Sequence, residues 1–191
     1  AQLIVLDMDT YGGDALAGCV VAEANFTDSP TMDDLYGHGT HVAGIIAANH
    51  DELGTAGLAP RSRLMNVKVA DDRGRCQPSA VAQGIIGAVD QGGLVINISI
   101  EIGEPSAELE NAVEYAWNKG AIIVAAAGND GSGLPAYPAF YQHSIAVAAT
   151  RPDDTLAPMS NHGAWVDVAA PGYGIYSTLP SNVKATMRSL C

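Results

Sequence analysis

Basic residues, aromatic residues, cysteines and long apolar runs are all scarce in this sequence. Only nine Lys and Arg oppose 21 Asp and Glu, which gives a formal net charge of −12. A phosphate-binding surface needs clustered cations, so a nucleic-acid partner is excluded. The apolar runs are far shorter than the ~20 residues that a membrane-spanning helix needs, so no membrane association is expected. No basic start followed by an apolar segment is visible, so no signal peptide is predicted.

Cysteine usage excludes a disulfide-stapled scaffold. The three cysteines are odd in number, and none has metal-site spacing, so Cys19 is expected to be a buried thiol. Hydrophobic residues are abundant, at 48% of the chain, and glycine and alanine are frequent. This composition is typical of a tightly layered globular protein, and 191 residues suffice for one sizeable core. We therefore predict a single domain over residues 1–191.

Hydrophobic periodicity predicts alternating strands and helices. Continuous apolar runs indicate strands buried on both faces, as in a parallel sheet. Stretches with apolar residues at helical spacing lie between them. The alternation predicts an α/β fold with three layers: a mostly parallel, twisted sheet with helices on both faces. Strands are predicted at 3–6, 19–21, 64–69, 94–98, 121–126, 144–149 and 165–168, and helices at 37–48, 78–91 and 106–119.

The segment 37–48 carries the first chemical signal. It begins with a histidine between two glycines and continues as an apolar helix, with Val42, Ile45 and Ile46 on one stripe. An apolar helix is buried, so its first turn is held in a fixed place. His38 lies in that turn, where the positive end of the helix dipole disfavours the imidazolium. We therefore expect a histidine that stays neutral near pH 7, as a general base requires.

Two other interpretations of this segment remain open. His38 and His41 are three residues apart, so both could ligate a metal, although no Glu lies between them and no third ligand is evident. His41 alone is more typical of a packed core histidine than of a catalytic one.

Several motifs in order resemble one enzyme family. The segment 37–48 is similar to the histidine motif of the subtilisin-like serine proteases (subtilases), especially of the thermitase-like branch. The likeness spans nearly the whole chain, from about residue 3 to residue 180. It continues through the motifs Val-Ile-Asn-Ile-Ser at 95–99, Val-Ala-Ala-Ala-Gly-Asn at 124–129, Tyr-Pro-Ala at 137–139, Asp-Val-Ala-Ala-Pro-Gly at 167–172 and Tyr-Ser-Thr at 176–178.

The resemblance implies an acid, a base and an oxyanion donor. Asp7 would be the acid, His38 the base and Asn129 the donor that stabilises negative charge on the substrate carbonyl. The family writes its acid motif as Asp, then Ser or Thr, then Gly, whereas Met8 and Asp9 follow Asp7 here. Asp7 remains the preferred acid because a buried run ends directly before it.

The resemblance also implies a substrate edge. In the family, an extended peptide lies beside the segment that begins at Ser99, and its first pocket is walled by the residues before the oxyanion Asn. Glu101 and Ile102 replace glycines of the family, so side chains stand where backbone should meet substrate. We favour obstruction of this edge by Glu101; selection of basic side chains is the alternative. The predicted substrate-binding residues are Ser99, Ile100, Glu101, Ala126, Ala127 and Gly128.

The loop 49–55 resembles a calcium loop of the family. Calcium takes six to eight oxygen ligands, so a carboxylate and several backbone carbonyls would be needed. A solvated acidic loop is the alternative interpretation. The predicted ligands are Asn49, Asp51, Leu53 and Thr55.

The nucleophile is the main departure from the family. The family continues after residue 180 to a Gly-Thr-Ser-Met-Ala motif that opens a central buried helix, and 181–191 do not match it. Ser189 lacks the motif, and Ser177 matches a position that is not catalytic. We therefore expect a subtilase domain truncated at both ends. Because its central helix would be missing, we expect marginal stability, self-association or completion by a missing C-terminal segment.

Three functions follow, in order of preference. The first is a serine endopeptidase that cleaves peptide bonds in proteins and, by family habit, acts outside the cell. The second is a catalytically inactive subtilase-like protein that binds peptides or partners. The third is a metal hydrolase that uses His38 and His41.

Overall fold

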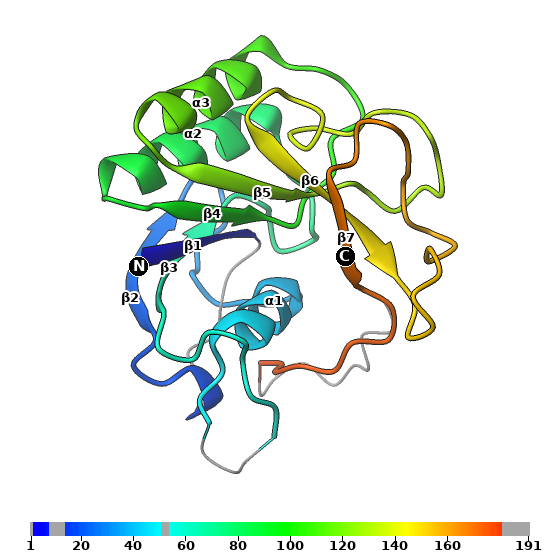
Figure 1. The fold of residues 1–191 in the computed structure, drawn as a ribbon. Coiled ribbons are helices and arrows are strands. Elements are labelled where there is room, and N and C mark those ends of the chain that lie inside the picture. Colours follow the sequence, from blue (N-terminus) through cyan, green and yellow to red (C-terminus); the bar gives the residue numbers. More distant parts are fainter. Residues whose placement is uncertain (1, 8–13, 51–53, 181–191) are drawn as a thin grey trace.

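Seven parallel strands form one sheet in the computed structural model, which describes residues 2–7, 14–50 and 54–180 (Figure 1). The order across the sheet is β2-β3-β1-β4-β5-β6-β7. From β1 the chain passes to the edge strand β2 and returns to place β3 between them; it then crosses to the other side of β1 and adds β4 to β7 in sequence order. The strands are β1 (Gln2–Asp7), β2 (Val20–Asn25), β3 (Arg63–Lys68), β4 (Val95–Ile98), β5 (Ile122–Ala126), β6 (Ser144–Thr150) and β7 (Val168–Pro171).

Helices cover both faces of this sheet, which confirms the predicted three-layer α/β fold. On one face lie α2 (Pro78–Asp90) and α3 (Ala107–Asn118), which follow β3 and β4 (Figure 1). On the other face lies α1 (His38–Ala47), which connects β2 to β3. The short helix η1 (Asp14–Leu16) packs against α1. None of the helices in the described ranges has the length and apolarity to cross a bilayer.

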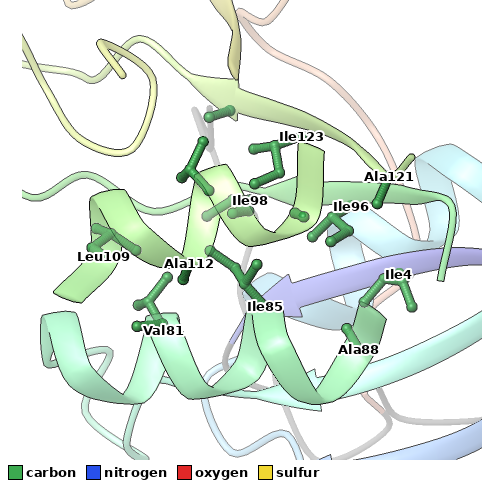
Figure 2. Packing of buried hydrophobic residues seen from close by; sticks show 14 of the residues in the cluster. Ile4, Val81, Ile85, Ala88, Ile96, Ile98, Leu109, Ala112, Ala121 and Ile123 are labelled. Carbon is green, nitrogen blue, oxygen red and sulfur yellow. The ribbon is translucent and has the colours of Figure 1, made fainter. Parts of the chain in front are cut away.

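Strand β1 serves both hydrophobic layers. Ile4 packs in the larger cluster beneath α2 and α3, whereas Val5 packs in the smaller cluster around α1 (Figure 2). Both side chains are fully buried. Successive residues of a strand point to opposite faces, so this one strand is buried on both sides, as its continuous apolar run predicts.

Most element boundaries agree with the sequence prediction to within one or two residues. Pro78 begins α2, where its missing N–H is not needed. Ser106 caps α3, and its hydroxyl accepts a hydrogen bond from the Leu109 N–H at 3.4 Å. Strand β2 is longer than predicted, because alternate residues of this edge strand face solvent and interrupt the apolar run.

The prediction of the last strand was wrong in position. The predicted range 165–168 overlaps β7 only at Val168. Gly163 to Val166 instead form a turn, closed by a Val166 N–H to Gly163 carbonyl bond. Trp165 supplies the apolar signal, but its ring packs edge-on against Phe140 and its indole N–H donates to the Gly133 carbonyl.

One half of the α1 face carries an apolar groove. Helix α1 packs mainly on β1 and β3, and among the described residues a groove remains between α1 and the same face of β5, β6 and β7. The side chains of Val124 and Val147 are only half-buried there, and all of β7 is exposed. The groove is lined by Val42, Ile45, Ile46, Asn97, Ser99, Val124, Ala125, Ala126, Val147, Ala148, Ala149, Ala170, Pro171, Gly172 and Ile175.

Two cysteines of the described residues are free thiols. Cys19 is buried, as predicted, and its thiol lies 3.4 Å from the Ala47 carbonyl. Cys76 is partly buried. Burial raises the pKa of both thiols, so neither is predisposed to form a thiolate.

Candidate active site

A buried carboxylate–imidazole pair lies at the carboxyl end of β1. Asp7 is the last residue of β1, and His38 is the first residue of α1. Asp7 follows Val5 on the α1 face of the strand, and its Oδ1 accepts a hydrogen bond from His38 Nδ1 at 2.5 Å. Their side chains are 1% and 6% exposed. The strand order reverses between β1 and β4, which is where open parallel sheets form ligand sites.

The charge of this pair changes the proton affinity of His38. Burial is the largest influence and lowers the pKa of the imidazole. The charge of Asp7, its hydrogen bond and the charge of Asp34 together outweigh burial, so the pKa of His38 is raised above its usual 6.5. The helix dipole alone predicts a lowered pKa, so the expected direction was wrong: the influences of Asp7 and Asp34 outweigh burial, which is the influence that lowers the pKa of His38.

Asp34 fixes the first turn of α1. Its carboxylate is 1% exposed and accepts hydrogen bonds from the Gly37 N–H at 2.5 Å and the Thr40 N–H at 3.0 Å. It also accepts a bond from the Thr40 hydroxyl at 2.7 Å. A carboxylate that satisfies the free N–H groups of a helix start stabilises that start. Asp34 therefore holds the turn that presents His38.

A buried lysine anchors the loop before Asp34. Lys68, the last residue of β3, is 1% exposed and pairs with the Asp72 carboxylate at 2.8 Å. Its ammonium also donates to the carbonyls of Thr31 at 3.1 Å and Asp33 at 3.3 Å. The hydrogen bonds from Lys68 and Ser29 lower the pKa of Asp72. The segment entering α1 is thus tied to the end of β3.

Asn129 shares one hollow with the buried pair. It follows β5 in a turn that Gly128 enters with φ +107°. This site hollow also holds four of the predicted substrate-binding residues, from the strand ends of β4 and β5. Its lining is Asp7, Tyr36, His38, Ala70, Gly74, Cys76, Ser99, Ile100, Glu101, Ala126 and Asn129.

The other two predicted substrate residues lie beside the site hollow. The Ala127 side chain is buried, and its N–H bonds the Val147 carbonyl at 2.8 Å. The Gly128 carbonyl accepts from the Asn161 N–H at 2.9 Å. Ser99 and Ala126 line both the site hollow and the apolar groove, so the two depressions meet there.

His41 occupies a packed position. It is 3% exposed, and its Nε2 lies 3.2 Å from the Ile175 carbonyl. Burial, the largest influence, lowers the pKa of its imidazole and outweighs the opposing hydrogen bond to Ile175. Ser177 and Thr178 cross α1 nearby, donating to the carbonyls of His41 and Thr40. Within the described ranges, no cluster of three His, Cys, Asp or Glu could hold a metal, which disfavours a His38–His41 metal site.

The predicted calcium loop is only partly described. Asp51 and Leu53 lie outside the described residues, as do Met8, Asp9 and Ser189. The Asn49 side chain is already engaged: its amide donates to the Ala17 carbonyl and its oxygen faces the Cys19 thiol. Thr55 has a buried hydroxyl oxygen without a hydrogen-bond partner. That oxygen fits a cation ligand, whereas the side chain of Asn49 does not.

Sequence reasoning missed three residues that organise the site. Asp34 lies three residues before the N-cap Gly37, and an acidic residue close to a helix start is a signal that could have been found. Asn161 carries none, because Glu101 and the turn that it braces are distant in the sequence. Lys68 has one near partner, Asp72, but the carbonyls of Thr31 and Asp33 that it holds lie 37 and 35 residues away, so spacing does not reveal its role. Asn161 Oδ1 accepts from the N–H groups of Asp130 at 3.0 Å and Ser132 at 3.1 Å, so it braces the turn after Asn129.

The family model and the similar proteins that match this chain indicate the same protein family. A model described as the Subtilase family matches residues 15–190. The chain is 47% identical to thermitase of Thermoactinomyces vulgaris, over 90% of this chain and 62% of that protein. It is 45% identical to a thermophilic serine proteinase of Bacillus sp. (strain AK1), over 97% of this chain and 47% of that protein. Subtilisin Savinase of Lederbergia lenta is 42% identical over 83% of this chain and 59% of that protein. The chain thus spans about half the length of these relatives.

Proposed function

This chain belongs to the subtilase family, and from that premise we propose that it forms part of a single serine endopeptidase domain. Asp7 is the acid, His38 the base and Asn129 the oxyanion donor. The reaction is hydrolysis of peptide bonds in proteins. Relatives named as a serine proteinase and as proteases support this reaction class.

The Asp7–His38 pair is the observation that carries the proposal. Because Nδ1 donates to the Asp7 carboxylate, Nε2 is the nitrogen left with a lone pair. That nitrogen takes the proton from a serine hydroxyl as the hydroxyl oxygen attacks the substrate carbonyl carbon. Asp7 stabilises the resulting imidazolium, which then gives the proton to the leaving amine. The raised pKa of His38 is consistent with stabilisation of the imidazolium by Asp7.

Asn129, which lines the same site hollow, completes the proposed chemistry. Attack on the carbonyl places negative charge on its oxygen, and the side-chain amide of Asn129 is a suitable donor to that charge. A donor held in place before the reaction stabilises the transition state without reorganisation. The shared site hollow of Asp7, His38 and Asn129 supports this role.

We propose that the serine is carried by a segment that packs into the apolar groove. The resemblance implies a helix there, and the groove is lined mostly by apolar side chains. It meets the site hollow at Ser99 and Ala126, so a helix beginning at that junction would present its first turn to His38. A C-terminal segment beyond the described residues would be one occupant, and self-association would be another way to cover the groove.

A peptide substrate would lie along the segment that begins at Ser99. An added strand gains main-chain hydrogen bonds, which gives broad specificity. Ser99, Ile100, Glu101 and Ala126 line the site hollow, which supports this placement. We further propose an extracellular site of action and a structural calcium ion held by Asn49 through its carbonyl, Asp51, Leu53 and Thr55. Calcium would tie the loop together and would take no part in the reaction.

A catalytically inactive peptide-binding protein is the second candidate. The Glu101 carboxylate reaches across to the Asn129 turn, where it occupies part of the edge that substrate would use. Binding without turnover would then be the function of the same edge.

Treatment with a serine-directed phosphonate separates the two candidates. An active serine protease gives one covalent adduct by intact mass, and peptide mapping identifies the serine. The His38→Ala variant should give none, whereas the exposed His162→Ala variant should label normally. Absence of an adduct in the full-length protein, together with retained peptide binding, would favour the inactive binder.

A further inference from the structure

The side chain of Glu101 joins two segments that are distant in the sequence. Its Oε2 accepts a hydrogen bond from the Asn129 backbone N–H at 2.8 Å. Its Oε1 accepts one from the Asn161 side-chain amide at 3.0 Å. A carboxylate bound to N–H donors forms stronger bonds than a neutral acceptor does. The carboxylate therefore contacts the backbone of the residue that we assign as oxyanion donor.

Asn161, the second partner of Glu101, also forms hydrogen bonds with several residues of the turn that contains Asn129. Its backbone N–H donates to the Gly128 carbonyl at 2.9 Å, and its Oδ1 accepts from Asp130 and Ser132. Asn129 is thus flanked by bonded residues on both sides and is itself bonded to Glu101. The hydrogen bond between Glu101 and Asn161 requires glycine at position 128, because a Cβ there would overlap Glu101 Oε1 and Asn161 Nδ2. The turn, Asn161 and Glu101 form one hydrogen-bonded unit.

We propose that Glu101 is a positioning residue that fixes the oxyanion turn through the Asn129 N–H. This inference rests on the proposed role of Asn129. The catalytic value of a donor depends on its place before the reaction, and small displacements of a positioned group reduce rate strongly. Glu101 restricts the backbone of Asn129 and thereby the direction of its side-chain amide.

The bonding of Glu101 distinguishes this role from recognition of basic substrates. Each carboxylate oxygen already has a donor from the protein: Oε2 accepts from the Asn129 N–H, and Oε1 accepts from the Asn161 side-chain amide. The carboxylate is therefore oriented by the protein before any substrate arrives. If Glu101 instead recognised a cation of the substrate, its main contribution would be to substrate binding and not to the position of Asn129.

Amide hydrogen exchange of Asn129 tests the proposal directly, without enzyme activity. In the full-length protein, Glu101→Ala should speed exchange of the Asn129 N–H at least about tenfold, because its acceptor is lost. Glu101→Gln keeps one carbonyl acceptor, so it should restore part of the protection. Glu104→Ala is the matched control, since Glu104 is exposed nearby, and it should leave Asn129 unchanged. Unchanged exchange in Glu101→Ala, with the amides of β4 and β5 still protected, would overturn the proposal.

A double-mutant cycle tests the catalytic consequence. Glu101→Ala should lower kcat about tenfold or more at nearly constant KM, and should cause little further loss once Asn129 is Ala. Equal losses in both backgrounds would show that Glu101 does not act through Asn129. A rise in KM confined to substrates with basic side chains would instead identify Glu101 as a substrate contact. If no variant is active, the proposed function fails while hydrogen exchange still decides the role of Glu101.

Discussion

The two faces of the sheet differ in how completely they are covered. Under α2 and α3, residues such as Ile96, Ile98 and Ile123 are essentially inaccessible to solvent (Figure 2). On the opposite face, α1 covers β1 and β3 but leaves the apolar groove over β5 to β7. The catalytic candidates lie at the boundary between the covered and open halves of that face. The side chains of Asp7 and His38 are therefore held by packed structure, whereas the groove beside them is open among the described residues.

The largest effect on activity is expected for His38, which lies between the covered and the open half of the sheet face. In the full-length protein, His38→Ala should reduce kcat by about 10⁶, the loss known for the catalytic histidine of a subtilisin, because the proposed general base for the serine hydroxyl is removed. Steady-state hydrolysis of a peptide anilide would measure it. His162→Ala, on the exposed surface, should retain normal kcat. A His38→Ala enzyme with substantial activity would refute the assignment of the base.

The oxyanion donor should have a smaller effect than the base. Asn129→Ala should lower kcat by about 10²–10³ with nearly constant KM, the magnitude known for the equivalent subtilisin donor. The donor contributes mainly in the transition state, so substrate binding should change little. Asn118→Ala, at the exposed end of α3, provides the control in the same assay. A loss confined to KM would place Asn129 in substrate binding instead.

Matched valines measure the difference between the two faces. Val67 is fully buried in β3 in the cluster beneath α2 and α3, whereas Val147 is half-buried in β6 in the groove. Val67→Ala should lower the free energy of unfolding by about 2–3 kcal/mol, through lost burial and the cavity left behind. Val147→Ala should cost less than about 1 kcal/mol. Urea denaturation would compare them, and equal losses would mean that the groove is covered in solution.

The smallest effect concerns the protonation of His38. Asp7→Asn removes the charge that is the largest influence raising the pKa of this imidazole and leaves at most a neutral hydrogen bond, while burial remains, so the pKa should fall. In the unchanged protein, the raised pKa means that protonated His38 stabilises the fold fully below the unfolded value of 6.5. This stabilisation is lost as pH rises through the raised value.

Imidazole NMR titration would measure the pKa, and urea denaturation across pH would measure the linked stability. Asp28→Asn, an exposed carboxylate change, should leave both curves in place. An unchanged pKa of His38 in Asp7→Asn would contradict the attribution to Asp7.

The fold was largely predictable because buried strands and amphipathic helices carry local patterns. The apolar runs around Ile4 and Ile96 predicted the strands β1 and β4, and Pro78 predicted the start of α2. The strand assigned to Trp165 was misplaced because one aromatic residue in a turn resembled an apolar run. Long-range contacts were beyond local reasoning: Glu101 and Asn161 are 60 residues apart, so no spacing rule connects them.

The site was predictable in part. Family resemblance indicated Asp7, His38 and Asn129, and the structure brings the three to one site hollow. Their proposed roles await the kinetic tests above. The direction of the His38 pKa was mispredicted because only the helix terminus was considered. The decisive charges come from the end of β1 and from Asp34, and only the folded chain brings these to the imidazole.

Ile4 and Val5 point to opposite faces of β1, and this affects how Asp7 is placed against His38. If β1 slipped by one position along its neighbours, these two side chains would exchange layers, and Asp7 would turn away from α1. Mispairing of this strand is therefore penalised by hydrophobic burial as well as by the lost contact with His38. The same packing that stabilises the sheet selects the alignment in which Asp7 contacts His38.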